Sequence, residues 1–472
     1  MGDAQRTYIC IDLKTFYASV ECADRGRDPF TTNLVVADPD RGPSTICLAI
    51  TPAMKKLGIR NRCRVFDIPA HVDYIMAKPR MHHYMEVSAK IYGIYLEYVS
   101  AEDVHVYSID ECFIDATPYL ALYGLTAREF ARHLMDAVRT RTGICATAGI
   151  GPNLFLAKVA LDITAKHVPD GIGVLDDDSF RRLIWPHRPI TDIWGIGPGI
   201  AARLARYNVF DLMGVAALNE EILYRELGVN AEYLIDHAHG REPCTIADIH
   251  AYRPAATSLS NGQVLARDYS YTEAYTVLRE MVDASALDLV DRRAVCDRIS
   301  LYVGYGRGAA PNDALPPGCL DPARHSALDD TALIGARGGA AHAGPLFTGE
   351  HGTRPVAGRA AYAHAGGQRK IGEQTNSFKH LMHHFDHLFR DTIDPKRPIR
   401  RINIGMGNLI PEEMASYDLF CDVEAEEQER RLQRTVLDVK QRYGKNALLK
   451  GTNFKRGATG RERNNQVGGH HA

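Results

Sequence analysis

The sequence has no closely paired cysteines, no long apolar run and almost no net charge. Its ten cysteines include no C-x-x-C pair and no spacing typical of a zinc site, which favours reduced thiols over disulfides or a zinc knuckle. No apolar run approaches the roughly 20 residues of a membrane span, and the first residues lack the pattern of a signal peptide. We therefore expect a cytoplasmic protein with no membrane association.

Composition and charge do not single out a partner. The net charge is −2, and hydrophobic and charged residues make up 45% and 24% of the chain, which is ordinary for soluble globular proteins. A near-neutral total excludes no class of partner, because acidic surface elsewhere can balance a basic binding face. At 472 residues the chain exceeds one hydrophobic core, so several domains are expected.

Strand and helix patterns interleave in the first half of the chain, which predicts an α+β fold. A short apolar run at residues 8–13 precedes a helical pattern that starts at residue 16. Apolar runs at 34–37 and 46–50 flank a turn-rich segment and predict a pair of strands. Further helices are predicted over 82–99, over 126–141 and near 153, and further strands at 104–115 and 146–151.

The segment VHVYSIDECFID, residues 104–115, resembles a buried strand but carries Asp110 and Glu111 near its middle. Neighbouring strand residues point to opposite faces, so both carboxylates reach one site only near a strand end, a turn or a bulge. Asp12, which ends YICID, is the natural third carboxylate on a neighbouring strand. Three carboxylates suit Mg²⁺, and two ions about 4 Å apart can activate a hydroxyl and steady a leaving pyrophosphate. An acidic pair alone is also compatible with a helix cap or a surface turn.

Four motifs then occur in the order found in Y-family translesion DNA polymerases. They are IDLKTFYASVE at 11–21, SIDECFID at 108–115, GIGPNLFLAKVALDITAK at 149–166 and WGIGPGIAARL at 194–204. The chain is similar to the bacterial UmuC-like (ImpB/MucB/SamB) branch of that family. The resemblance implies a right-hand polymerase with palm, fingers, helical thumb and little-finger domains. It also implies error-prone, DNA-directed DNA synthesis across lesions, in DNA repair and the SOS response.

The domain boundaries follow from these motifs and from shifts in composition. Palm and fingers are predicted at 1–184 (fingers about 20–82), a thumb with a helix-hairpin-helix at 185–245 ending in a linker at 242–254, a DNA-binding little finger at 255–420, and a tail at 421–472. Residues 307–367 contain 32 Gly, Ala or Pro in 61 residues and are interpreted as a mobile insertion, the alternative being a long ordered loop. Residues 430–463 hold eleven Lys or Arg against two acids, which suits DNA but also an ordinary solvated helix face.

By the resemblance, Asp12, Asp110 and Glu111 are the catalytic residues and ligate two Mg²⁺ ions, with the Leu13 carbonyl as a further metal ligand. Phe16 and Tyr17 lie against the incoming nucleotide, where the Tyr17 ring excludes a 2′-hydroxyl; the alternative is that both are core aromatics. Lys55 and Lys166 pair with the triphosphate. Lys55 stands where relatives have an arginine, and this weakens the grip on phosphate.

Two further motifs predict macromolecular contacts. Glycines 195, 197 and 199 of GIGPG allow a tight turn whose amides meet the DNA backbone, although an ordinary helix corner has the same pattern. Leu419 and Phe420, after Ser416 in place of the usual glutamine, resemble a peptide that binds the sliding clamp, or else are core residues at a strand end. The expected partners are primer–template DNA, dNTPs and the sliding clamp, and the protein is expected to be a monomer.

A cluster of histidines raises a metal question apart from the polymerase motifs. His380, His383, His384 and His387 share a helical face opposite an apolar stripe. With no carboxylate or cysteine partner evident in sequence, the pattern favours a solvated polar face over a metal site.

Two other functions are weighed against the polymerase. An accessory DNA-binding protein with an inactive palm is disfavoured by the presence of all three carboxylates. A nucleotidyl cyclase shares the two-metal palm but leaves the GIGPG hairpin and the basic tail without a role.

Overall fold

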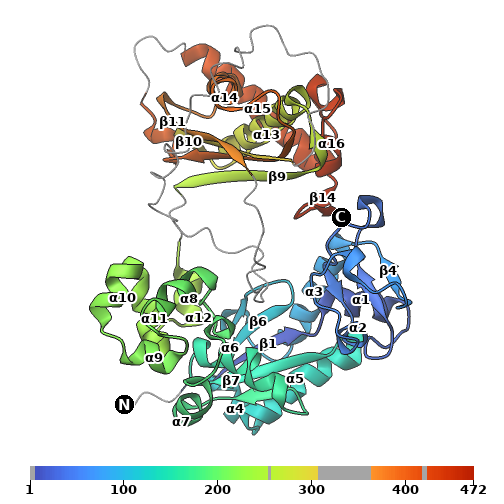
Figure 1. Ribbon diagram of the computed structural model, residues 1–472, viewed down its shortest axis with the longest axis vertical. Helices are drawn as coiled ribbons and strands as arrows, with labels where there is room; N and C mark the ends of the chain where they lie inside the picture. Colours follow the sequence, from blue (N-terminus) through green and yellow to red (C-terminus); the bar gives the residue numbers. More distant parts are fainter. Residues whose placement is uncertain (1–5, 254–256, 307–362, 417–422, 472) are drawn as a thin grey trace. The chain divides into compact units, whose positions relative to one another are not determined.

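The computed structural model describes residues 6–253, 257–306, 363–416 and 423–471. The described residues up to Arg253 form one compact unit and those from residue 257 onward form a second. Figure 1 shows the elements of both units. No helix among the described residues is long and apolar enough to cross a membrane.

A five-stranded sheet is the centre of the first unit, in the order β5-β6-β1-β7-β8. Its strands are β1 (Tyr8–Leu13), β5 (Val104–Val106), β6 (Glu111–Asp115), β7 (Ala146–Gly151) and β8 (Ile172–Val174). The central strand β1 runs antiparallel to both β6 and β7. The predicted passage from strand to helix is confirmed, because β1 leads into α1 (Phe16–Asp24).

The prediction of one continuous strand over residues 104–115 is wrong. Strands β5 and β6 are two arms of an antiparallel hairpin, with Val106 opposite Cys112. Residues 107–110 form the turn between the arms. Two adjacent carboxylates are tolerated because Asp110 lies in this turn and only Glu111 belongs to a strand.

Helix α6 (Leu154–Asp162) packs directly on the backbone of β7 and covers one face of the sheet. A Cβ on Gly149 would lie 2.1 Å from the carbonyl oxygen of Ala157, so only glycine allows this approach. Tyr8 and Cys10 of β1 share a hydrophobic cluster with α6. By the alternation of strand residues, Asp12 belongs to the same face.

The remaining elements of the first unit surround this sheet (Figure 1). A second sheet has the order β3-β2-β4, with β2 (Leu34–Val36), β3 (Ala49–Ile50) and β4 (Ile75–Ala77); the predicted pairing of β2 with β3 is confirmed. The helices are α2 (Pro52–Lys56), α3 (Met81–Tyr95), α4 (Thr117–Tyr123), α5 (Ala127–Thr142), α7 (Asp177–Ser179), α8 (Pro198–Ala205), α9 (Leu212–Ala217), α10 (Glu220–Leu227), α11 (Ala231–Ala238) and α12 (Ile246–Ala251).

Helix α12 corrects the expectation of a plain linker at 242–254. Thr245 caps this helix, and Ile246 is buried in the same cluster as Tyr8 and Leu154. The chain therefore returns to the central sheet before it leaves the first unit.

The second unit is a five-stranded antiparallel sheet backed by helices; four strands follow the order β11-β10-β12-β9, and β13 pairs with β10. Its strands and first helices are β9 (Ser258–Tyr269), α13 (Tyr271–Asp291), β10 (Ala294–Tyr305), β11 (His364–Thr375), α14 (Phe378–Thr392), β12 (Ile399–Gly407) and β13 (Ile410–Pro411). One hydrophobic cluster joins the inner sheet face to α13 and α14. The predicted insertion at 307–367 needs a correction at its end, because β11 begins at His364 and pairs with Gly304; residues 307–362 lie outside the described residues.

The predicted tail is packed against the second unit. It contains α15 (Val423–Tyr443), α16 (Gly460–Arg463), β14 (Gln466–Val467) and β15 (His470–His471). Glu280 on α13 accepts hydrogen bonds from Asn453, from Thr459 and from the backbone N–H of Gly460. Internal ion pairs, such as Lys450 with Asp283, neutralise part of the tail's positive charge.

Candidate active site

The three predicted carboxylates meet where β1 ends and β6 begins. Asp12 lies directly opposite Glu111 in the pairing of these strands. The N–H of Leu13 donates a 2.8 Å hydrogen bond to the carbonyl oxygen of Asp110. The structure therefore brings Asp12, Leu13, Asp110 and Glu111 together from segments about a hundred residues apart in the sequence.

The turn that carries Asp110 is fixed from both sides. The Ser108 hydroxyl donates to Oδ1 of Asp110 at 2.6 Å. Ser88 on α3 donates to the carbonyl oxygen of Ile109 at 2.6 Å. These contacts restrain the backbone around Asp110 before any ligand is bound.

Lys158 is a site residue that the sequence reasoning missed. Its Nζ lies 2.8 Å from Oε1 of Glu111 and 3.1 Å from Asp162, and its side chain is 4% exposed. It comes from α6, so only the packing of that helix on the sheet reveals the contact. In the sequence, Lys158 lies within the motif GIGPNLFLAKVALDITAK, but the motif predicts a phosphate contact only for Lys166.

Crowding of negative charge sets the protonation of this site. Burial, with repulsion from Asp110 and Glu111, raises the pKa of Asp12 well above its usual range, and Lys158 opposes this shift. Burial also raises the pKa of Glu111, again against the effect of Lys158. A cation placed among these oxygens would lower both values.

The side chains of Tyr17 and Phe16 differ in their exposure. The Phe16 side chain is 2% exposed and belongs to the core, and its contact with a nucleotide stays a prediction. The Tyr17 ring is partly exposed and stacks on Tyr84 with centroids 4.6 Å apart. Burial and the charge of Asp110 raise the pKa of Tyr17 to about 12, so the phenol is neutral near pH 7.

The two predicted phosphate-binding lysines lie on the borders of the same site. Lys55 is on α2 and Lys166 follows α6 in a 3₁₀ turn. Desolvation lowers the pKa of Lys55; Asp12 acts to raise it and Lys166 to lower it further. Asp12 and Lys166 therefore both act on the charge of Lys55.

The glycines of GIGPG are open to solvent at the start of α8. Gly195 has a positive φ of 86°, and an added Cβ at Gly195, Gly197 or Gly199 would meet nothing within 4 Å. The preceding Trp194 donates from Nε1 to the Tyr107 hydroxyl at 3.1 Å, which joins this motif to the β5–β6 turn. Leu419 and Phe420 lie outside the described residues.

The outer face of the sheet in the second unit is a further feature that the sequence did not reveal. Arg298 of β10 pairs in register with Lys370 of β11, and Arg401 of β12 pairs with Gly304 of β10. All three basic side chains are exposed. Among the outward positions paired in register over residues 258–264, 298–304, 364–370 and 401–407 none is acidic, and five are glycine: Gly262, Gly304, Gly366, Gly405 and Gly407. Asp268, further along β9, forms an ion pair with Arg400. We call this surface the basic sheet face.

Comparison with solved structures defines the class of fold. A Y-family DNA polymerase chimera of Dbh and Dpo4 matches with a TM-score of 0.57 and 17% sequence identity, over 86% of this chain and 99% of that one. The predicted α+β right-hand polymerase fold is thereby confirmed.

Comparison of sequences gives the family. Residues 11–162 match the impB/mucB/samB family and residues 256–419 match the C-terminal domain of that family. The putative UV-damage repair protein UvrX of Bacillus subtilis is 32% identical over 64% of this chain and 71% of its own length. DNA polymerase IV 2 of the same organism is 26% identical over 99% of both chains. This chain belongs to the impB/mucB/samB family, as its motifs predicted.

Proposed function

We propose that this protein extends a primer on template DNA by two-metal nucleotidyl transfer, and that error-prone synthesis across damaged bases in the SOS response is its role. Membership of the family makes the chain a DNA-directed DNA polymerase. The observation that carries the two-metal proposal is the meeting of Asp12, Asp110 and Glu111 at the ends of two paired strands.

The residues at this place fit divalent metal ions. Every donor is an oxygen, which is the preference of Mg²⁺, and mutual repulsion already raises the pKa of Asp12. Asp12, Asp110, Glu111 and the Leu13 carbonyl would hold two ions. When bound, the ions would activate the primer hydroxyl and neutralise charge on the leaving pyrophosphate.

The chain's own residues would position the other reactants. The Tyr17 ring would fill the space beside the sugar C2′ and exclude a 2′-hydroxyl. Lys55 and Lys166 would bind the triphosphate of a dNTP as point charges.

Three surfaces would hold macromolecular partners. The amides at Gly195, Gly197 and Gly199 and the basic sheet face would bind the phosphate backbone of primer–template DNA without reading its sequence. Leu419 and Phe420 would bind the sliding clamp, which would recruit a monomeric polymerase to the primer end.

Primer extension with Mg²⁺ and dNTPs, on undamaged and abasic templates, tests the proposal. The variant Asp110→Asn/Glu111→Gln keeps the shape of both side chains but removes their charge, and we expect extension to fall by about 10³-fold or more. Glu102→Gln, an exposed position before β5, is the matched control and should extend normally.

Three outcomes would point elsewhere. Primer–template binding without extension, even with the clamp present, would favour an accessory DNA-binding protein. Release of a cyclic nucleotide without primer extension would favour a cyclase. Normal extension by Asp110→Asn/Glu111→Gln would remove these carboxylates from the reaction.

A further inference from the structure

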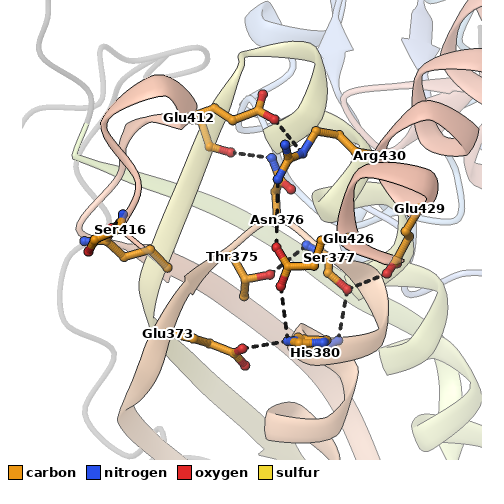
Figure 2. Close-up of polar contacts among 12 residues, drawn as sticks. Glu373, Thr375, Asn376, Ser377, His380, Glu412, Ser416, Glu426, Glu429 and Arg430 are labelled. Atoms are coloured by element: carbon orange, nitrogen blue, oxygen red, sulfur yellow. Dashed lines mark hydrogen bonds and ion pairs between the residues drawn. The ribbon is translucent and has the colours of Figure 1, made fainter. Parts of the chain in front are cut away.

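A second cluster of ionisable side chains lies in the second unit, apart from the polymerase site. Glu373 of β11, His380 of α14 and Glu426 of α15 each offer one ligand atom, and these atoms all lie within 4.8 Å of one another. Nδ1 of His380 is 2.6 Å from Glu373 and 3.9 Å from Glu426. Figure 2 shows both carboxylates directed at this imidazole.

A second imidazole extends the cluster. His384 lies one helical turn after His380, and its Nε2 is 3.0 Å from the other oxygen of Glu373. The expectation that the histidines have no carboxylate partner is therefore wrong for His380 and His384. The sequence concealed these partners because Glu373 and Glu426 are brought in by a neighbouring strand and a later helix.

A simple hydrogen bond between histidine and glutamate leaves part of this arrangement unexplained. Nδ1 of an imidazole carries at most one proton, yet two carboxylates face it. The contacts that surround this imidazole and its partners involve four carboxylates (Glu373, Glu412, Glu426 and Glu429) and two guanidinium groups (Arg430 and Arg434). With neutral histidines, these side chains carry more negative than positive charge, which suits a bound cation.

The spacing also suits a metal ion. Zn²⁺ binds imidazole nitrogen and carboxylate oxygen at roughly 2.0–2.2 Å, so ligand atoms of a tetrahedral site lie about 3.4 Å apart. The contacts of 2.6 and 3.9 Å around Nδ1 of His380 bracket that value. Small side-chain rotations would bring the donors to an ion, and partial exposure of Glu373 and His380, at 35% and 33%, gives it a way in.

We propose that Glu373, His380, His384 and Glu426 bind one divalent transition-metal ion, for which Zn²⁺ is the reference. The ion joins three elements, β11, α14 and α15, and so fastens α15 to the sheet. A neighbouring charge orients one of the ligands, because Arg430 lies 3.9 Å from the second oxygen of Glu426. This site does not depend on the polymerase reaction.

The test is metal binding by the full-length protein, freed of metal by a chelator and held in excess Mg²⁺ to occupy the polymerase site. We expect one tightly bound Zn²⁺ per chain by equilibrium dialysis with metal analysis. Co²⁺ in its place should give visible absorption bands typical of four-coordinate nitrogen and oxygen ligation, and Zn²⁺ should raise the melting temperature.

Two variants separate this site from chance binding. Glu373→Gln/His380→Gln should lower Zn²⁺ affinity by about 100-fold and abolish the rise in melting temperature. His383 and His387 are exposed on the same helix with ring centroids 4.6 Å apart and are a weak chelator in their own right. The control His383→Gln/His387→Gln should therefore keep the tight site.

Each alternative result overturns the proposal. Absence of tight Zn²⁺ binding to the intact protein would show that the cluster is only an ion-pair network. Loss of binding in the His383→Gln/His387→Gln control, with retention in Glu373→Gln/His380→Gln, would place the ion on the exposed histidines. If the double variant does not fold, Glu426→Gln at the start of α15 replaces it, and unchanged affinity there would exclude Glu426 as a ligand.

Discussion

Lys158 is the buried cation beside the carboxylates of the candidate active site. Its side chain and that of Glu111 are 4% and 9% exposed, so neither charge is well solvated. Removing one member of a buried ion pair costs more than the pair itself contributes, because the other charge stays buried. Lys158 therefore positions Glu111 and opposes the rise that burial causes in the pKa of Glu111.

We predict that Lys158→Met lowers the free energy of unfolding by about 3–5 kcal/mol, measured by urea denaturation. Glu111 and Asp162 would be left without their shared cation. Lys90→Met, at an exposed position of α3, should change stability by less than about 0.5 kcal/mol. Adding Glu111→Gln to Lys158→Met should recover part of the loss, and no recovery would show that the pairing is not its cause.

Tyr17 is the residue on which sugar selection would depend. Its ring is held by stacking on Tyr84, whose hydroxyl in turn donates to Glu21 at 2.8 Å. We predict that Tyr17→Ala raises ribonucleotide incorporation on the order of 10- to 100-fold, measured as the ratio of kcat/KM for dNTP and rNTP. Tyr17→Phe keeps the ring and should discriminate like the natural protein. Unchanged sugar discrimination in Tyr17→Ala would remove the steric role.

At the scale of elements, a buried carboxylate joins α1 to α3. The Glu21 side chain is fully buried and forms ion pairs with Arg25 and Arg80, besides its bond from Tyr84. Burial alone would raise the pKa of Glu21, but the hydrogen bonds from Arg80, Arg25 and Tyr84 outweigh burial and lower it. This contact holds α1, which carries Tyr17, against α3, which carries Tyr84.

The lowered pKa gives this contact a defined dependence on pH. A carboxyl group whose folded pKa is below its unfolded value stabilises the fold above the unfolded pKa, and the stabilisation is lost as pH falls through the folded value. We predict that Glu21→Gln lowers the free energy of unfolding by about 2–3 kcal/mol at pH 7, and that the difference narrows below about pH 4. Urea denaturation across pH 3–7 measures both. Glu86→Gln, at an exposed position of α3, should show no such change, and a difference that stays constant down to pH 3 would contradict the linkage.

At the scale of the whole molecule, the proposed DNA contacts would be divided between two compact units. The first carries the carboxylates and the open glycines of α8, and the second carries the basic sheet face. The glycines of this face carry no side chain, so a phosphate backbone could approach Arg298, Lys370 and Arg401 closely. The tail's contribution is smaller than its composition suggests, because Arg430, Arg431, Arg434, Lys450 and Arg456 form ion pairs within the second unit.

We predict that Arg298→Gln/Lys370→Gln/Arg401→Gln weakens binding to primer–template DNA and lowers the slope of log affinity against log salt by about 2–3, since each phosphate contact contributes about 0.9. Fluorescence anisotropy over a series of salt concentrations measures the slope. The loss should be the same for unrelated DNA sequences. Arg139→Gln on α5, with a side chain 63% exposed, is the control; an unchanged slope in the triple variant would exclude this face from the DNA interface.

The sequence by itself determined the fold class and the family, and it predicted that the three carboxylates form one site. Periodicity gave β1 followed by α1 and the helices α3 and α5, because their patterns are local. It failed for residues 104–115, since a short turn between two strands has the same alternation as one longer strand.

Only the tertiary structure decided which distant side chains meet. Glu111 contacts Lys158 because glycines in β7 let α6 lie on the sheet. His380 contacts Glu373 and Glu426 because β11 and α15 bring these carboxylates to α14. The three basic residues of the sheet face come from three strands and share a surface only through their register. Such contacts depend on packing between segments far apart in the chain, whereas periodicity and short motifs report only on neighbours in sequence.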